Sequence, residues 1–133
     1  MGRLHVVIGI IINSNKECCI AKRAKNAHLG GLWEFPGGKV EPDEEVKTAL
    51  TRELFEELGI MVEEAEPFMQ LPYDYEDRKV LLDFWLIRQF KGEPKGREGQ
   101  PVKWVSLQEL QDHEFPEANR PVIARLLENN KAC

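Results

Sequence analysis

The sequence lacks the features of a disulfide-rich, membrane-spanning or nonspecific nucleic-acid-binding protein. Its three cysteines, Cys18, Cys19 and Cys133, are an odd number without metal-type spacing, which predicts a reducing, cytoplasmic setting. The longest apolar run, residues 5–12, is far shorter than the roughly 20 residues that span a bilayer, and it has no signal-peptide cleavage site. With 18 Lys and Arg against 23 Asp and Glu, the net charge is −5, which disfavours nonspecific binding to a nucleic-acid backbone. A phosphate-bearing ligand therefore needs a metal ion or a local group of basic side chains.

No repeat, low-complexity tract or linker divides the chain, so residues 1–133 are expected to form one domain. Residues 4–12 and 17–23 are predicted to form a hairpin around a turn at 13–15, and residues 33–35 a short strand that Pro36-Gly37-Gly38 stops. Further strands are expected at 61–71, 80–90 and 102–106, and a closing helix at 118–130. Since these elements do not follow a βαβ rhythm, the expected fold class is α+β with a mixed sheet.

The clearest predicted element is a helix that begins near Asp43 and ends at Gly59. Asp43 is expected to cap the free N–H groups, with Glu44 and Glu45 complementing the dipole in the first turn. Aliphatic residues at positions 46, 50, 54 and 58 recur every four residues and form the stripe that faces the core. Gly59 then supplies the left-handed residue that ends the helix.

Three glutamates of this helix lie near its apolar stripe. At about 100° per residue, Glu57 falls within the stripe, Glu53 lies beside it and Glu56 continues round from there. An ionised carboxylate there is costly unless it is paired or metal-bound, and these three converge within about 6 Å of one another. Such oxygen ligands favour Mg²⁺ or Mn²⁺, and a backbone carbonyl at Gly37 or Gly38 could complete the set. A solvated acidic face is the alternative, and it suits the outer positions of the helix better.

Residues 38–60, GKVEPDEEVKTALTRELFEELGI, match the Nudix box, G-x5-E-x7-R-E-U-x-E-E-x-G-U with U aliphatic, at every fixed position. The sequence therefore resembles the Nudix hydrolases. The resemblance implies an α/β/α sandwich that carries a catalytic loop–helix–loop, and hydrolysis of a nucleoside diphosphate linked to another group. Within the box, Arg52 is expected to form a structural salt bridge with Glu44, and both are predicted to support catalysis.

Beyond the box, the chain is similar to the MutT branch of the family over nearly its whole length, on segments such as WEFPGGK at 33–39 and EFPEANRPVIARL at 114–126. Members of that branch hydrolyse oxidised guanine nucleotides, so the resemblance implies Mg²⁺-dependent cleavage of 8-oxo-dGTP to 8-oxo-dGMP and pyrophosphate. Pyrimidine-nucleotide Nudix enzymes share part of this sequence. The alternative is therefore a pyrophosphatase that acts on CTP or dCTP, or on nucleoside triphosphates broadly. A nonenzymatic Nudix nucleotide-binding module is a further alternative, but such proteins usually lose box carboxylates that are present here.

The resemblance also assigns roles outside the box. Glu98, in the loop KGREGQP, is expected to approach the metal and is the second candidate for general base after Glu53. The carboxamide of Asn119 offers the donor and the acceptor that reading an oxidised guanine edge requires, although capping of the last helix is an alternative. The predicted metal ligands are Gly37, Gly38, Glu53, Glu56, Glu57 and Glu98. The predicted substrate contacts are Leu4, Val6, Arg23, His28, Glu34, Phe35, Pro36, Gly37, Arg78 and Asn119.

The expected partner is a small nucleotide rather than a nucleic-acid polymer or a membrane, and the chain is expected to act as a monomer. Asp83 places a charge in the otherwise apolar 80–90 strand and has no predicted role.

Overall fold

The computed structural model describes residues 3–26 and 30–132. Its larger sheet has the strand order β4-β1-β6-β5, and its smaller antiparallel sheet the order β3-β2-β7. In the larger sheet, β1 runs parallel to β6, whereas the β1–β4 and β5–β6 pairs are antiparallel. The strands are β1 (Leu4–Ile11), β2 (Glu17–Lys22), β3 (Trp33–Glu34), β4 (Gly37–Lys39), β5 (Met61–Asp74), β6 (Lys79–Lys91) and β7 (Val102–Ser106).

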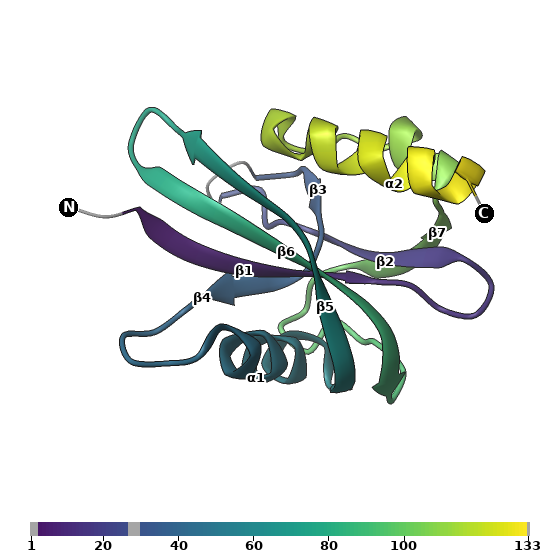
Figure 1. Ribbon diagram of the computed structural model, residues 1–133, viewed down its shortest axis with the longest axis horizontal. Helices are drawn as coiled ribbons and strands as arrows, with labels where there is room; N and C mark the ends of the chain where they lie inside the picture. The colour runs from purple at the N-terminus through teal and green to yellow at the C-terminus, as the bar shows by residue number, and fades with distance from the viewer. Residues whose placement is uncertain (1–2, 27–29, 133) are drawn as a thin grey trace.

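Two helices, α1 (Val46–Leu58) and α2 (Arg120–Ala132), lie on opposite sides of the larger sheet (Figure 1). Short 3-10 turns at Gln108–Asp112 and Glu117–Asn119 lead into α2. The expected α+β class with a mixed sheet is therefore confirmed. None of the helices in the described residues is long and apolar enough to cross a membrane.

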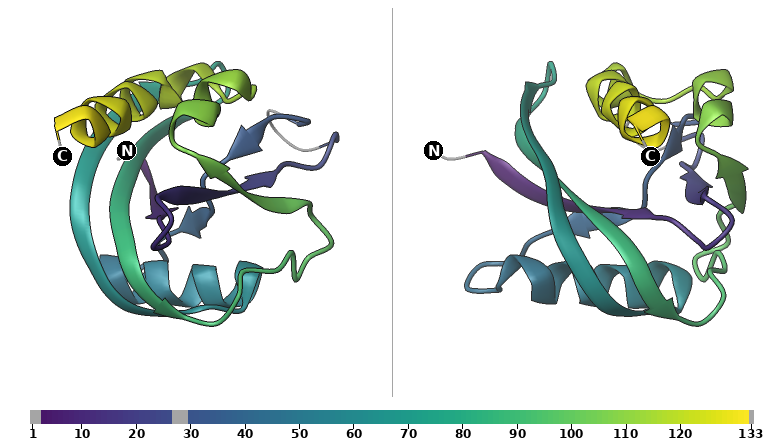
Figure 2. Two further views of the ribbon diagram at one scale, coloured as in Figure 1. Left: turned by 90° about the vertical axis from the view of Figure 1, so that its right-hand side faces the viewer. Right: turned by 45° about the vertical axis from the view of Figure 1, so that its right-hand side comes forward.

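Alternation along β1 distributes the core between the two faces of the sheet. Ile8 and Ile10 belong to a buried cluster that includes residues of α2, and Val7 and Ile11 to a cluster that includes residues of α1. The predicted stripe of α1 is confirmed, since its leucines at 50, 54 and 58 are at most 1% exposed. The two further views show the sheet curving between the two helices (Figure 2). Even-numbered side chains of β1 therefore lie on the α2 side of the sheet, and odd-numbered ones lie on the α1 side.

The hairpin prediction holds for the turn but is wrong for the strands. Asn13 N donates to Glu17 O at 3.0 Å, and Ile12 forms a bridge with Cys18, so the turn closes as expected. Beyond it, β1 joins the larger sheet while β2 joins the smaller one. The strands diverge because β1 takes β4 and β6 as its neighbours.

The predicted start of the helix is also wrong. α1 begins at Val46, and Asp43 has a positive φ of 64° and does not cap the helix. Glu45 occupies the cap position without a side-chain cap bond, so Glu44 and Glu45 precede the first turn. The turn before α1 is shaped instead by Glu44, whose carboxylate accepts a hydrogen bond from Glu41 N at 3.0 Å. The predicted end is confirmed, because Gly59 is left-handed at φ 74°.

Other strand and helix boundaries differ from the predictions for local reasons. The short strand β3 ends before Pro36 as expected, but Gly37–Lys39 forms a separate strand, β4, which pairs with β1 in the larger sheet. β5 extends to Asp74 through Pro67 and Pro72, which an edge strand with register shifts tolerates. The closing helix begins at Arg120 rather than at residue 118, after a 3-10 turn, and Pro121 lies in its first turn as expected.

The unexplained carboxylate of β6 has a partner on β1. Asp83 is 3% exposed, and its Oδ2 lies 2.8 Å from His5 Nε2. A buried carboxylate with a hydrogen-bond partner avoids most of the cost of burying an unpaired charge. Asp83 therefore belongs to the packing between β1 and β6.

Candidate functional site

A pocket of about 250 Å³ lies on the α2 face of the larger sheet and reaches the glycines of β4. Apolar side chains of β1 and β6 form part of its wall, and charged or amide side chains from several loops form the rest. The lining residues are Leu4, Val6, Ile8, Arg23, Glu34, Phe35, Gly37, Gly38, Lys39, Tyr75, Arg78, Val80, Leu82, Pro116 and Asn119. The pocket thus combines apolar walls with a few convergent polar groups, which is typical of a small-molecule site.

The structure brings most of the predicted substrate contacts into this one pocket. The predicted contacts among its lining residues are Leu4, Val6, Arg23, Glu34, Phe35, Gly37, Arg78 and Asn119. Pro36 is buried and is not among the lining residues; its carbonyl accepts a hydrogen bond from Gly9 N at 2.8 Å. His28 lies outside the described residues.

Two polar groups of the pocket are held by neighbours. Arg23, the residue after β2, donates from Nη1 to Oε1 of Glu34 in β3 at 2.6 Å. Burial raises the pKa of Glu34, while the Arg23 guanidinium opposes the rise. Asn119 is 8% exposed, and its Nδ2 lies 3.4 Å from Pro116 O, so its carboxamide is oriented at the pocket wall.

Where α1 meets this pocket the charges of four carboxylates act on one another, and we call Glu34, Glu53, Glu57 and Glu98 the carboxylate cluster. Burial raises the pKa of Glu57 to about 8, and the charges of the other three members add to the rise. Burial also raises the pKa of Glu53, with the Arg52 guanidinium opposing it. The cluster therefore holds more negative charge than its surroundings stabilise.

The glycines of β4 allow α1 to approach the sheet edge. Glu57 Oε2 accepts a hydrogen bond from Gly37 N at 3.0 Å. A Cβ built on Gly38 would overlap the carboxylate of Glu53, and one built on Gly37 would overlap the carbonyl of Val7. Any larger residue at either position would displace a neighbour, so Gly38 allows α1 to approach β4 closely and Gly37 allows β4 to approach β1.

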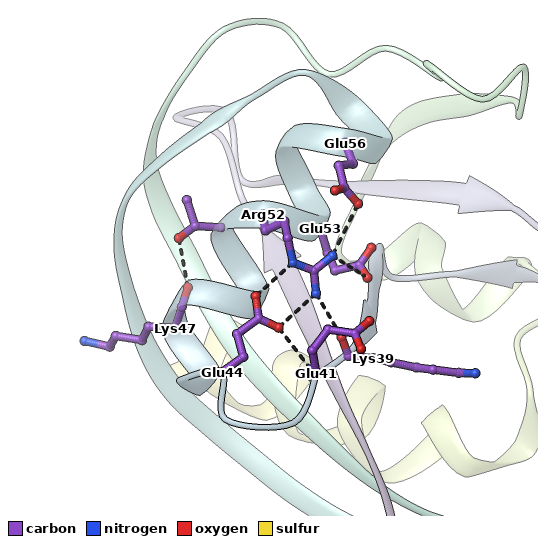
Figure 3. A network of polar contacts seen from close by, with 8 residues as sticks. Lys39, Glu41, Glu44, Lys47, Arg52, Glu53 and Glu56 are labelled. Carbon is purple, nitrogen blue, oxygen red and sulfur yellow. Dashed lines mark hydrogen bonds and ion pairs between the residues drawn. The ribbon is translucent and has the colours of Figure 1, made fainter.

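Arg52 ties α1 to the loop that precedes it (Figure 3). Its Nε and Nη2 donate to the two carboxylate oxygens of Glu44 at 2.8 and 3.0 Å, so the predicted salt bridge is confirmed. Nη2 also donates to Lys39 O at 3.2 Å. Nη1 lies 3.4 Å from Glu53 and 3.3 Å from Glu56, which places a cation beside the carboxylate cluster.

The comparisons with known proteins agree with this geometry. The NUDIX domain family matches residues 7–125, which is most of the chain and includes α1 and most of the residues that line the pocket. This chain belongs to the Nudix family.

Two relatives and one solved structure show where the chain lies within the Nudix family. The 8-oxo-dGTP diphosphatase of Escherichia coli K12 is 47% identical, over 95% of this chain and 98% of its own. The CTP pyrophosphohydrolase of the same strain is 35% identical, over 88% of this chain and 86% of its own. A MutT structure from a study of Aliivibrio salmonicida and Vibrio cholerae is 44% identical, with a TM-score of 0.85 over 96% of this chain and 99% of its own.

The donors of this Nudix site fit a hard divalent cation. Among residues 3–26 and 30–132, no three His, Cys, Asp or Glu side chains form a preformed metal site. Oxygen donors nevertheless gather beside the β4 glycines, where burial first and the neighbouring carboxylates second raise the pKa of Glu57. Glu56 lies at the edge of this group, with its carboxylate turned toward Arg52. A divalent cation would suit this donor set, because it would neutralise the neighbouring carboxylates.

Sequence reasoning missed several residues of the pocket. Ile8 continues the alternation of Leu4 and Val6, so the period-two pattern of β1 was a sufficient signal for it. Val80 and Leu82 follow only from the parallel register, in which they pair with Leu4 and Val6. The missed polar members are Lys39 and Tyr75; burial raises the pKa of Tyr75, so its phenol stays protonated.

The Glu44–Arg52 pair predicts a pH-dependent contribution to stability. Hydrogen bonds from Arg52 and Glu41 lower the pKa of Glu44 from 4.5 to about 2. A lowered pKa means that the contribution is complete above pH 4.5 and is lost as the pH falls toward about 2. We expect Glu44→Gln to lower the free energy of unfolding at neutral pH, and to lower it less in acid. Urea denaturation of both proteins across this range measures the difference, with Glu45→Gln as the exposed control; an equal loss at every pH contradicts the prediction.

Proposed function

We propose that this Nudix protein hydrolyses nucleoside triphosphates to the monophosphate and pyrophosphate, with 8-oxo-dGTP as its main substrate and Mg²⁺, or Mn²⁺, as its cofactor. The observation that carries the proposal is that the pocket adjoins the carboxylate cluster. Glu34 belongs to both, and Glu53 and Glu57 lie against the β4 glycines that line the pocket. The 8-oxo-dGTP diphosphatase activity of the relative that is 47% identical supports the choice of substrate.

In this proposal the pocket binds the base between apolar walls. Leu4 and Val6 contact its faces, while Asn119 and Arg78 donate to its polar edge. Arg23 faces the phosphates from the end of β2, where a guanidinium can form charge-assisted hydrogen bonds with an oxyanion. The negative chain thereby binds a polyanion through local cations rather than through its net charge.

The carboxylate cluster supplies the chemistry. Glu53 takes a proton from the water that attacks the β-phosphorus, and the bond from that phosphorus to the α,β-bridging oxygen breaks. The raised pKa of Glu53 brings this carboxylate closer to the range in which a general base is effective at neutral pH. Bound Mg²⁺ supplies neutralisation of the triphosphate charge and a lower pKa for the attacking water. Glu53, Glu56, Glu57 and Glu98, with a carbonyl at Gly37 or Gly38, would hold it.

A panel of 8-oxo-dGTP, dGTP, dCTP and CTP tests the substrate. We expect the highest kcat/KM for 8-oxo-dGTP, because the carboxamide of Asn119 can pair with an oxidised purine edge. The relative that is a CTP pyrophosphohydrolase makes the pyrimidine nucleotides the informative competitors. A higher kcat/KM for CTP or dCTP than for either purine contradicts the proposed substrate.

Asn119→Ala tests the base recognition directly. Since the carboxamide lines the pocket and lies at its wall, we expect its removal to lower kcat/KM for 8-oxo-dGTP more than for dGTP, by roughly ten- to a hundredfold. Steady-state kinetics on both nucleotides measures the ratio. An equal loss of kcat/KM on both substrates contradicts base recognition and favours a structural role for Asn119 at the start of α2.

The cellular setting is part of the proposal. The protein acts in the cytoplasm as a monomer on free nucleotides, where it removes oxidised guanine nucleotides before a polymerase can use them. Burial of the two thiols at positions 18 and 19, each 0% exposed, suits a reducing compartment.

A further inference from the structure

The segment between β6 and β7, residues 92–101, runs past the C-terminal end of α1 (Figure 2). The last carbonyls of a helix lack partners within the helix, and this segment supplies some. Lys95 N donates to Leu58 O at 3.0 Å, and Arg97 N donates to Glu57 O at 3.0 Å. The segment is therefore docked on the helix that carries two members of the carboxylate cluster.

One side chain of the segment joins two acidic residues of the site. Gln100 Nε2 donates to Glu57 O at 3.3 Å, and Gln100 Oε1 accepts from Glu98 N at 3.0 Å. A carboxamide carries a donor and an acceptor on one planar group, so a single side chain can make both bonds. Gln100 is partly buried against α1, whereas Glu98 is exposed. The backbone of Glu98 is thus attached to α1 through Gln100.

The position of Glu98 matters to the rest of the cluster. After burial, the negative charge of Glu98 is among the causes that raise the pKa of Glu53 and Glu57. The four carboxylates therefore interact electrostatically, although Glu98 comes from a loop and the other three from secondary-structure elements. A loop carboxylate keeps such a place only where its backbone is fixed.

We propose that Gln100 is a positioning residue, whose carboxamide fixes the backbone of Glu98 against the last turn of α1 and so holds the Glu98 carboxylate beside the cluster. The inference rests on the proposed function, in which Glu98 takes part in hydrolysis. Removing the carboxamide leaves the segment bound through Lys95 and Arg97 but releases Glu98. The effect of Gln100 on turnover then passes through Glu98.

A double-mutant cycle tests that route. We expect Gln100→Leu to lower kcat about tenfold, with a smaller change in KM. The displacement of a catalytic group slows the chemical step more than it weakens substrate binding. In the double variant with Glu98→Gln, the loss should equal that of Glu98→Gln alone, since Gln100 has no carboxylate left to position. Additive losses overturn the proposal. Gln108→Leu, an exposed glutamine on the 3-10 turn, is the matched control and should leave kcat unchanged.

Amide hydrogen exchange, followed by NMR without nucleotide or metal, gives a readout independent of activity. In Gln100→Leu the amide proton of Glu98 should exchange faster than in the wild type, while those of Lys95 and Arg97 keep their protection. Unchanged exchange at Glu98 overturns the proposal, and so does a loss of protection across all three, which indicates a detached segment. A wild-type protein that cleaves no nucleotide contradicts the proposed function instead, and selective exchange at Glu98 then still supports the contact.

Discussion

Glu53→Gln is expected to lower turnover of 8-oxo-dGTP by roughly 10²–10⁴-fold while the protein stays folded. The amide keeps the shape of the carboxylate but cannot take a proton from water. Burial and neighbouring carboxylates raise the pKa of Glu53, so removing its charge relieves repulsion, and stability at neutral pH should not fall. Pyrophosphate release gives the rate, and thermal unfolding shows that the fold is intact.

Glu45→Gln is the matched control for this substitution. Glu45 is exposed at the cap position of α1 and does not line the pocket, so its variant should turn over at the wild-type rate. Turnover near the wild-type rate in Glu53→Gln contradicts its role as the base and transfers that role to Glu98. Glu98→Gln measured in the same assay compares the two candidates.

Gly38→Ala is expected to lower turnover about a hundredfold with little loss of stability. The added methyl group would overlap the carboxylate of Glu53, which is the far end of a flexible side chain and can move aside. The backbone of β4 therefore keeps its place while the proposed base is displaced. Steady-state kinetics and urea denaturation on the same preparation separate the two effects.

Gly37→Ala, one residue earlier, provides the contrast. Its methyl group would overlap the carbonyl of Val7 and the Cα of Ile8, which are backbone atoms that cannot move without disturbing the β1–β4 pairing. We expect this variant to lose about 1–3 kcal/mol of stability. Equal stability losses in the two variants contradict the steric account, as does wild-type turnover in Gly38→Ala.

Local patterns in the sequence were sufficient for the parts of the site that lie on one element. The four-residue stripe of α1 predicted both its buried face and the glutamates beside it, because a helix has a fixed angular period. Leu4 and Val6, which the resemblance to the MutT branch implied as substrate contacts, both line the pocket. The fixed positions of the Nudix box added the pairing of Arg52 with Glu44.

Contacts between residues far apart in the chain could not be predicted from the sequence. Asp83 meets His5 across 78 positions, and Gln100 reaches Glu57 across 43, so neither pair leaves a periodic signal. β4 is three residues long and begins with two glycines, a composition that favours a turn. It becomes a strand because it pairs with β1. Strand pairing and loop docking therefore account for what the sequence did not predict.

Pyrophosphate release from 8-oxo-dGTP, measured with Mg²⁺, after chelation with EDTA and after Mg²⁺ is restored, tests the central claim most directly. The proposal predicts one pyrophosphate for each 8-oxo-dGMP, no release in EDTA and full recovery with the metal. Release that is indifferent to EDTA, or orthophosphate as the product, would contradict it.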